Sequence, residues 1–310
     1  MKRKIAKIGP STLMISLPNK WAKQHGLQKG DEVDVLEQEN SLLVHANHAK
    51  IQKTLNIHIK NASAFLERVL TRPYIAGYDE LCVTFEDPSV LQKINQTLSE
   101  GHMGFVVVEQ GSRSCTIKNI AEEYEEDLDR FINKTFLCLI TFAKESMDLI
   151  KKREYAKLEG LRNVYKIIIK FGRLCLRILN KKGCKNKKNL PSHYELTAAY
   201  SVVRSIMHSG NVLISLCANL KDLSPKTKIK PETLRICQGA VSLIEESYAN
   251  YKKHACLETF YKYKQKMHSL KEPAKKILAK GGFPDALIVS KMLVLREHLY
   301  PLARYSYFPD

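Results

Sequence analysis

Four short runs of alternating apolar and polar residues predict strands in the first fifty residues: Arg3–Ile8, Leu13–Leu17, Glu32–Glu37 and Ser41–His45. Between the second and third runs, Asn19–His25 follows Pro18 as a short helix, which Gly26 can close in the left-handed conformation. Four short strands and one helical turn cannot bury a core by themselves. The pattern therefore predicts that this segment pairs with a second copy.

The pattern changes in the next seventy residues, where longer amphipathic runs alternate with strand-like ones. The predicted elements are a helix over Asn61–Thr71, a strand over Glu80–Phe85, a helix from Asp87-Pro88-Ser89 through Leu98, and strands over Gly104–Glu109 and Ser114–Ile120. This order of helix, strand, helix, strand, strand predicts a small α+β layer.

From about residue 121 the chain follows a helical period. The predicted helices span 121–152, 154–182, 192–221, 231–252, 256–280 and 284–308. One apolar stripe illustrates the spacing of a core-facing helix side: Leu161, Val164, Ile168, Phe171, Cys175 and Ile178. We expect a helical bundle made of two three-helix halves.

The three patterns together predict the fold class, a multidomain α+β protein. Residues 1–50 would form short strands that pair with a second copy, 51–120 a linking α+β layer, and 121–310 an all-α bundle. A chain of 310 residues is long enough for two or three such domains.

Charge is distributed unevenly over these segments. The formal net charge is +18, of which residues 1–50 carry +3, residues 51–118 carry zero and the remainder carries +15. A basic surface favours an anionic partner such as nucleic acid, acidic lipid or a phosphorylated ligand. A lysine-rich solvated surface is the alternative interpretation of the +15.

The cysteines and the missing motifs limit the class of protein. None of the eight cysteines forms a CxxC pair, and several lie in apolar runs, which predicts reduced, buried thiols and a cytoplasmic location. We see neither a signal peptide nor an apolar run long enough to cross a bilayer. Nucleotide-binding and nucleophile-elbow motifs are also absent from the sequence, so we expect no enzyme activity.

The opening segment carries a family resemblance. The stretch from Arg3 to Lys23, the continuation Gly26–Val35 and the closing Ser41–Val44 closely resemble the AbrB/SpoVT swapped-hairpin DNA-binding domain. The resemblance implies that two chains interleave their hairpins into one barrel, and that the homodimer binds DNA. The same family includes antitoxins that occlude a toxin, but the long helical segment after this one argues against that role here.

The residues of this segment suit contact with a phosphate backbone, and the candidates are Arg3, Lys4, Lys7, Ser11, Thr12, Lys20 and Lys23. Arg3, Lys4 and Lys7 place cations on and beside the first strand, while the hydroxyls of Ser11 and Thr12 lie at a turn. Lys20 and Lys23 project from the predicted short helix. Ordinary solvated cations are the alternative, and we expect Trp21 to be a core residue.

Three stretches in the rest of the chain carry a second resemblance: Ile75–Leu81, Gly104–Gln110 and Ile120–Phe136. With these stretches the chain resembles archaeal phosphate-uptake regulators, in which a PhoU-like domain follows an AbrB-like one. It implies a link to phosphate sensing, and many members of the family bind metal clusters through Glu/Asp-x-x-x-Asp motifs.

The metal motifs are degenerate in this chain. The first matching place has Arg204 and His208 instead of two acids, and the second, Glu297 to Pro301, keeps one. We therefore expect no metal or other cofactor. The acidic run from Glu122 to Asp129 has i,i+4 pairs, but it opens a predicted helix, where negative charge favours the helix dipole.

Two functions are consistent with the sequence. One is a dimeric DNA-binding transcription regulator linked to uptake of phosphate or another inorganic ion, with the bundle as its sensory or partner-docking part. The alternative is a protein–protein adaptor that acts on a transporter or signalling partner, in which the barrel serves only for dimerisation and the basic bundle docks on the partner.

Overall fold

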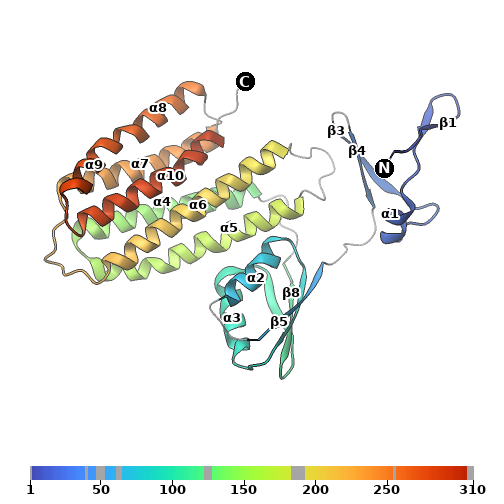
Figure 1. Ribbon diagram of the computed structural model, residues 1–310, viewed down its shortest axis with the longest axis horizontal. Helices are drawn as coiled ribbons and strands as arrows, with labels where there is room; N and C mark the ends of the chain where they lie inside the picture. Colours follow the sequence, from blue (N-terminus) through green and yellow to red (C-terminus); the bar gives the residue numbers. More distant parts are fainter. Residues whose placement is uncertain are drawn as a thin grey trace. The chain divides into compact units, whose positions relative to one another are not determined.

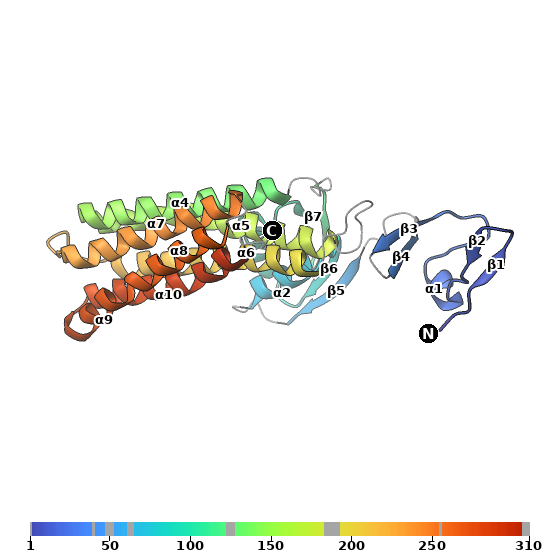
Figure 2. The ribbon, with the colours of Figure 1, turned by 90° about the horizontal axis from the view of Figure 1, so that it is seen from above.

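In a computed structural model of the chain, the described residues are 2–38, 41–46, 53–60, 65–121, 128–182, 193–253 and 256–305. Contacts divide them into two units: a first unit that ends at Ala46 and a second unit that begins at Lys53. The elements of both units are labelled in Figure 1 and seen from above in Figure 2. The predicted domain boundaries after residues 50 and 120 stay predictions.

The first unit consists of two hairpins and a short helix. Strands β1 (Ala6–Ile8) and β2 (Thr12–Met14) pair antiparallel, and so do β3 (Val33–Gln38) and β4 (Ser41–Ala46). Helix α1 (Asn19–Gln24) lies between the hairpins, and Gly26 follows it with a φ of 64°, as predicted. The first strand is shorter than predicted, because the chain pairs only from Ala6 onward.

No side chain described between residues 2 and 46 is buried. The large apolar side chains of this unit are instead exposed to solvent: Ile5, Ile8, Leu13, Met14, Ile15, Leu17, Val35 and Leu42. Uncovered strand faces of this kind cannot stabilise a hairpin in water. The described side chains of the first unit therefore form no core within one chain.

The second unit begins with a four-stranded sheet in the order β5-β6-β8-β7. Strand β5 (Thr54–Ile59) pairs parallel with β6 (Glu80–Phe85), whereas β8 (Ser114–Asn119) pairs antiparallel with both β6 and β7 (Phe105–Gln110). The strand over Glu80–Phe85 has the predicted bounds. Strand β5 is missing from the prediction, although Leu55, Ile57 and Ile59 alternate with polar residues there.

Helices α2 (Leu66–Ile75) and α3 (Val90–Gly101) pack with this sheet around a core that includes Leu70, Ile94 and Ile117. His102 joins the two helices. Its Nε2 lies 2.9 Å from the Thr71 hydroxyl and its Nδ1 lies 3.0 Å from the Thr97 carbonyl oxygen. Burial lowers the pKa of His102 to about 4, so the ring is neutral and donates from Nδ1 to the carbonyl.

The rest of the second unit is the helical bundle (Figure 1). Its helices are α4 (Leu128–Lys152), α5 (Arg162–Lys182), α6 (His193–Leu220), α7 (Pro231–Lys253), α8 (Leu257–Ser269), α9 (Lys271–Lys280) and α10 (Asp285–Tyr305). They share one hydrophobic core, which includes Leu161, Ile168, Cys175 and Ile178 of the predicted stripe. The two-halves arrangement stays a prediction.

Two predicted helices differ in the structure. The segment 154–182 begins as a 3-10 helix over Tyr155–Leu161 before α5 starts. The segment 256–280 is broken at Leu270, because Pro273 lacks an N–H and its ring would clash with the carbonyl of Ser269 in a continuous helix. The predicted features at 122–127, 183–192 and 306–308 lie outside the described residues.

Candidate nucleic-acid interface

The β1–β2 hairpin positions three of the seven candidate residues around one turn. Ile8 pairs with Thr12 and Lys7 with Leu13, so the turn of Gly9, Pro10 and Ser11 projects from the end of the hairpin. Gly9 adopts a φ of 73°, which a residue with a side chain rarely does. Lys7, Ser11 and Thr12 are all exposed and lie within six positions of one another.

Arg3 and Lys4 lie just before β1, not on it. The structure therefore corrects their predicted position on a strand, because no partner residue pairs with them in the described chain. Both side chains are exposed. Exposed cations outside a strand can contact phosphate groups without matching a strand register.

Helix α1 presents Lys20 and Lys23 on its exposed side. Trp21 and Ala22 are half-buried between them, and the indole ring centroid lies 4.9 Å from that of His25. The helix therefore has a cationic outer side and an aromatic inner side. The prediction that Trp21 belongs to a core is met only in part within one chain, since no described residue of this unit is fully buried.

The five candidate cations form no ion pair with any acidic residue that the structure describes. Of the acids in this unit, Asp31 accepts a hydrogen bond from the Gln28 backbone N–H at 2.6 Å. Each exposed, unpaired cation can neutralise a phosphate without first breaking an internal contact.

The sequence singled out a second place, the degenerate metal motifs. The structure brings His208 of α6 and His298 of α10 together, with ring centroids 5.1 Å apart. Burial, Arg204 and His298 lower the pKa of His208. No group of three or more His, Cys, Asp or Glu side chains in the described part of the chain could hold a metal ion.

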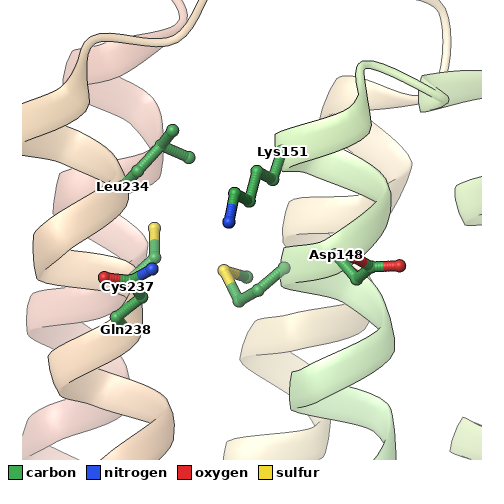
Figure 3. A pocket seen from close by; sticks show the side chains of 6 residues that line it. Asp148, Lys151, Leu234, Cys237 and Gln238 are labelled. Atoms are coloured by element: carbon green, nitrogen blue, oxygen red, sulfur yellow. The ribbon is translucent and has the colours of Figure 1, made fainter.

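A hollow of about 150 Å³ lies between α4 and α7, lined by Met147, Asp148, Lys151, Leu234, Cys237 and Gln238. In Figure 3, Lys151 reaches from α4 toward α7, whereas Asp148 points away from the gap. Burial raises the pKa of the Cys237 thiol to about 12, so this thiol is protonated near neutral pH. It lines the hollow as an apolar group, not as a thiolate.

Sequence reasoning missed one functional surface, the basic side of α5. This helix has seven basic and no acidic residues. Five of the cations recur at helical spacing on one side and reach the α+β layer: Lys166, Lys170, Arg173, Arg177 and Lys181. Their spacing of three and four residues was the signal that could have found this surface. Part of the bundle's positive charge is therefore neutralised inside the protein.

Arg177 is the centre of this contact, with only 4% of its side chain exposed. Its guanidinium donates to the carbonyls of Tyr74 (2.9 Å) and Tyr78 (2.6 Å) and to Asp79 Oδ1 (2.9 Å). The guanidinium carbon also lies 5.2 Å from the ring centroids of Tyr74 and Phe105. The contact thus combines buried hydrogen bonds with aromatic stacking.

Asp79 accepts from two cations of α5, because Lys181 Nζ also lies 2.9 Å from its Oδ1. Burial raises the pKa of Asp79, but the hydrogen bond and charge of Lys181 and the charge of Arg177 outweigh that effect and hold it below its ordinary value. The carboxylate is therefore ionised wherever this contact is formed.

Among helices of the described residues, none has the length and apolarity that crossing a bilayer requires.

A comparison with protein families matches residues 7–53 to the family described as antidote-toxin recognition MazE, bacterial antitoxin. The search of curated proteins found no match, and neither did the search of solved structures. The match covers α1 and nearly all of the two hairpins, with the candidates Lys7, Ser11, Thr12, Lys20 and Lys23, whereas Arg3 and Lys4 precede it. Residues 7–53 are therefore similar to a MazE antitoxin domain.

Proposed function

We propose that this protein is a dimeric DNA-binding transcription regulator, in which the first units of two chains interleave into one swapped-hairpin barrel. One observation carries the proposal: residues 2–46 combine an uncovered apolar set with cations that have no acidic partner. A second copy would cover the apolar faces and bring two sets of cations to one surface. The match of residues 7–53 to an antitoxin family supports this arrangement.

The exposed hairpin turn is the part best suited to contact a phosphate backbone. Ser11 and Thr12 offer hydroxyls beside Lys7, while Arg3 and Lys4 extend the cationic surface along the chain. Lys20 and Lys23 add a third region of positive charge on α1. Each phosphate that such a cation neutralises adds about 0.9 to the slope of log affinity against log salt.

For the second unit we propose a regulatory role, in which the bundle senses phosphate or another inorganic ion, or docks a partner. The support is the resemblance of its sequence to PhoU-like proteins, together with a helical bundle around one core. We propose no catalytic role for either unit. A change in the bundle would act on DNA binding by altering how the paired first units are presented.

Fluorescence anisotropy on labelled upstream DNA tests DNA binding by the full chain. We expect affinity to fall steeply with salt, and the double variant Arg3→Ala/Lys4→Ala to lower the salt slope by about 3.6 per bound dimer, because it removes four cations from the two chains. Lys252→Gln/Lys253→Gln, which removes the same charge from the end of α7, is the matched control and should leave the slope unchanged. Salt-insensitive binding, or equal slopes for both variants, would remove the basis of the proposal.

The link to phosphate needs a separate experiment. Genomic DNA that copurifies with the protein can be sequenced from cells grown with ample phosphate and from cells starved of it. We expect discrete upstream fragments whose recovery changes on starvation. Recovery of the same fragments under both conditions would keep the regulator and reject the phosphate link.

The name of the matched family favours a second candidate, recognition of a toxin. That function would require a segment that lies on the toxin and blocks it. Here the next described elements, β5 and α2, are part of a packed sheet and its core. Co-expression with candidate toxins tests this function, because an antitoxin restores growth whereas a regulator does not.

The adaptor alternative predicts that the bundle binds a stable protein partner and that the full chain does not bind DNA.

A further inference from the structure

One end of the bundle carries a concentration of cations that the proposed function does not use. This loop end consists of the close of α4, the connection 221–230 between α6 and α7, and the region where α9 meets α10; it lies at the left in Figure 1 and Figure 2. Hydrogen bonds tie it together, from Tyr155 Oη to the Thr227 carbonyl and from the Lys230 N–H to Asp285 Oδ1. Six exposed side chains give it positive charge: Arg153, Lys226, Lys228, Lys230, Lys276 and Lys280.

None of these six cations forms an ion pair with an acidic residue of the described chain. Acids of the same end pair with other lysines: Glu154 lies 3.0 Å from Lys157, and Glu159 lies 3.2 Å from Lys221. On α9, Glu272 pairs with Lys275 at 2.8 Å. The six charges are therefore available to an external anion.

Three of the cations alternate with less exposed residues on one short segment. Lys226, Lys228 and Lys230 are exposed, whereas Thr227 and Ile229 between them are half-buried. Lys226 lies in a turn that the Thr227 N–H closes on the Ser224 carbonyl at 2.8 Å, and Lys230 directly precedes α7. Five residues therefore place three ammonium groups in solvent.

Arg153 is held at a position where glycine is usual. It follows α4 with a φ of 60°, and its N–H and that of Glu154 donate back to the carbonyls of Ile150 and Leu149, at 3.1 and 2.9 Å. This is a Schellman end, whose left-handed residue is most often glycine because a side chain strains it. The chain keeps a cation there at a cost in backbone strain.

Apolar side chains lie beside the cations. Phe283, in the connection between α9 and α10, is 67% exposed, and Leu278 on α9 is 40% exposed. Gly282, next to Phe283, has open space around it. Exposed large apolar groups beside unpaired lysines are typical of surfaces that lie in the boundary between water and lipid.

We propose that the loop end is a docking surface for a membrane rich in anionic phospholipid. Charge complementarity selects an anionic occupant, and the chemistry of the cations selects lipid over protein. Five of the six are lysines, which protein–protein interfaces disfavour, whereas juxtamembrane polybasic segments use them as point charges on anionic headgroups. Phe283 and Leu278 would enter the headgroup boundary while the lysines stay at the surface.

Cosedimentation of the full chain with vesicles tests the surface. We expect binding to vesicles of phosphatidylcholine mixed with phosphatidylglycerol, no binding to phosphatidylcholine alone, and a loss of binding as salt rises. Each neutralised lysine should weaken binding about fivefold, so Lys226→Gln/Lys228→Gln/Lys230→Gln should weaken it about a hundredfold. Phe283→Ser should weaken binding to the mixed vesicles further.

Arg153→Gly is the variant that cannot fail through misfolding, because glycine suits the left-handed backbone. We expect it to bind mixed vesicles about fivefold more weakly with no loss of thermal stability. The matched control Lys252→Gln/Lys253→Gln/Lys264→Gln removes three exposed lysines outside the loop end and should bind almost as the unaltered chain does.

Three results would overturn the proposal: no sedimentation of the unaltered chain with mixed vesicles, equal binding to both vesicle types, or equal losses in the two triple variants. DNA binding measured on the same variants separates this surface from the first unit. Arg3→Ala/Lys4→Ala should lose DNA affinity and keep vesicle binding, and the loop-end triple should do the opposite. A loop-end triple that loses DNA affinity but not vesicle binding assigns the surface to DNA instead.

Discussion

The two units use similar local patterns but differ in where their apolar faces go. In the first unit, Leu13 is 67% exposed and no described side chain is buried. In the second unit, strand β6 alternates in the same way, yet Leu81, Val83 and Phe85 are covered by α2 and α3 of the same chain. An alternating strand therefore specifies only that one face must be covered. Whether the chain or a second copy covers it depends on the helices that the neighbouring segments supply.

The largest expected effect tests that difference directly. Leu13→Asp places a charge on the uncovered face of β2, where burial against a second copy would leave it unpaired. We expect the dimer to dissociate and DNA affinity to fall about a hundredfold or more, because two linked contacts become one. Sedimentation equilibrium and anisotropy measure the two effects.

Leu137→Asp is the matched control, since Leu137 of α4 is 50% exposed in the second unit. It should leave both the dimer and DNA binding unchanged. If Leu13→Asp still dimerises, or if Leu137→Asp also dissociates the dimer, the first unit does not depend on a second copy in the way proposed. Trp21, the one tryptophan of the chain, lets fluorescence follow the first unit separately.

The next effect concerns the second unit's own interface. Arg177→Met keeps the stem of the side chain but removes the guanidinium donor from the Tyr74 and Tyr78 carbonyls and leaves Asp79 with Lys181 as its one side-chain cation in the described chain. Removing one partner of a buried ion pair costs about 3–5 kcal/mol of the free energy of unfolding. Urea denaturation followed by far-ultraviolet circular dichroism measures the loss.

Arg173→Met is the comparison variant, because Arg173 pairs with Glu67, whose side chain is 60% exposed. A pair of that kind contributes about 0–1 kcal/mol. Equal losses in the two variants would show that burial of Arg177 is not what makes the contact strong. The fluorescence of Trp21 should be the same in both variants, because neither substitution lies in the first unit.

A close approach between the layer and α5 gives a smaller effect. A methyl group at Gly101 would meet the Arg173 guanidinium, whereas one at Gly160 would meet nothing within 4 Å. We expect Gly101→Ala to cost about 1 kcal/mol, because Arg173 must move away from its partner. Gly160→Ala should cost nothing, and the difference in urea midpoint measures the effect. Equal midpoints would mean that Arg173 moves freely.

The pH dependence of stability follows from Asp79. Its pKa is lower in the folded protein than in the unfolded chain, so the unfolded chain binds more protons in that range. The resulting stabilisation is complete above the ordinary pKa of 3.8 and is lost as pH falls through the lower, folded value. Acid titration of the circular dichroism signal should show this loss, and Asp79→Asn should flatten it. An unchanged acid transition in Asp79→Asn would assign the loss to other groups.

Local patterns were sufficient for elements with long or well-bounded runs, and long-range partners were not predictable from them. Strand β6 and the helices of the bundle followed their periods closely. Strand β5 was missed because its six residues have no turn signal before them, and its partner β6 begins more than twenty residues later. Pro273 broke a predicted helix whose apolar period continues across the break.

For the candidate site, the sequence indicated seven residues, five of them cations, but not whether those cations have acidic partners. Such pairing depends on three-dimensional neighbours. The cations of α5 show the opposite case, since Arg177 and Asp79 are 98 positions apart and neutralise one another. A net charge counted from the sequence therefore does not show whether a basic helix side pairs with acids of the same protein or is exposed to solvent.

The smallest expected effect concerns the paired imidazoles of α6 and α10, which lie at the two degenerate acidic motifs identified in the sequence. His208 and His298 supply two ligands, whereas a stable zinc site uses three or four protein ligands. Arg204, whose charge lowers the pKa of His208, also disfavours a cation there. We expect zinc or a chelator to leave the thermal midpoint unchanged, in the unaltered chain and in His208→Gln alike. A saturable, stoichiometric rise in the midpoint that His208→Gln abolishes would overturn this expectation, and the bundle would then depend on a ligand for stability much as the first unit depends on its second copy.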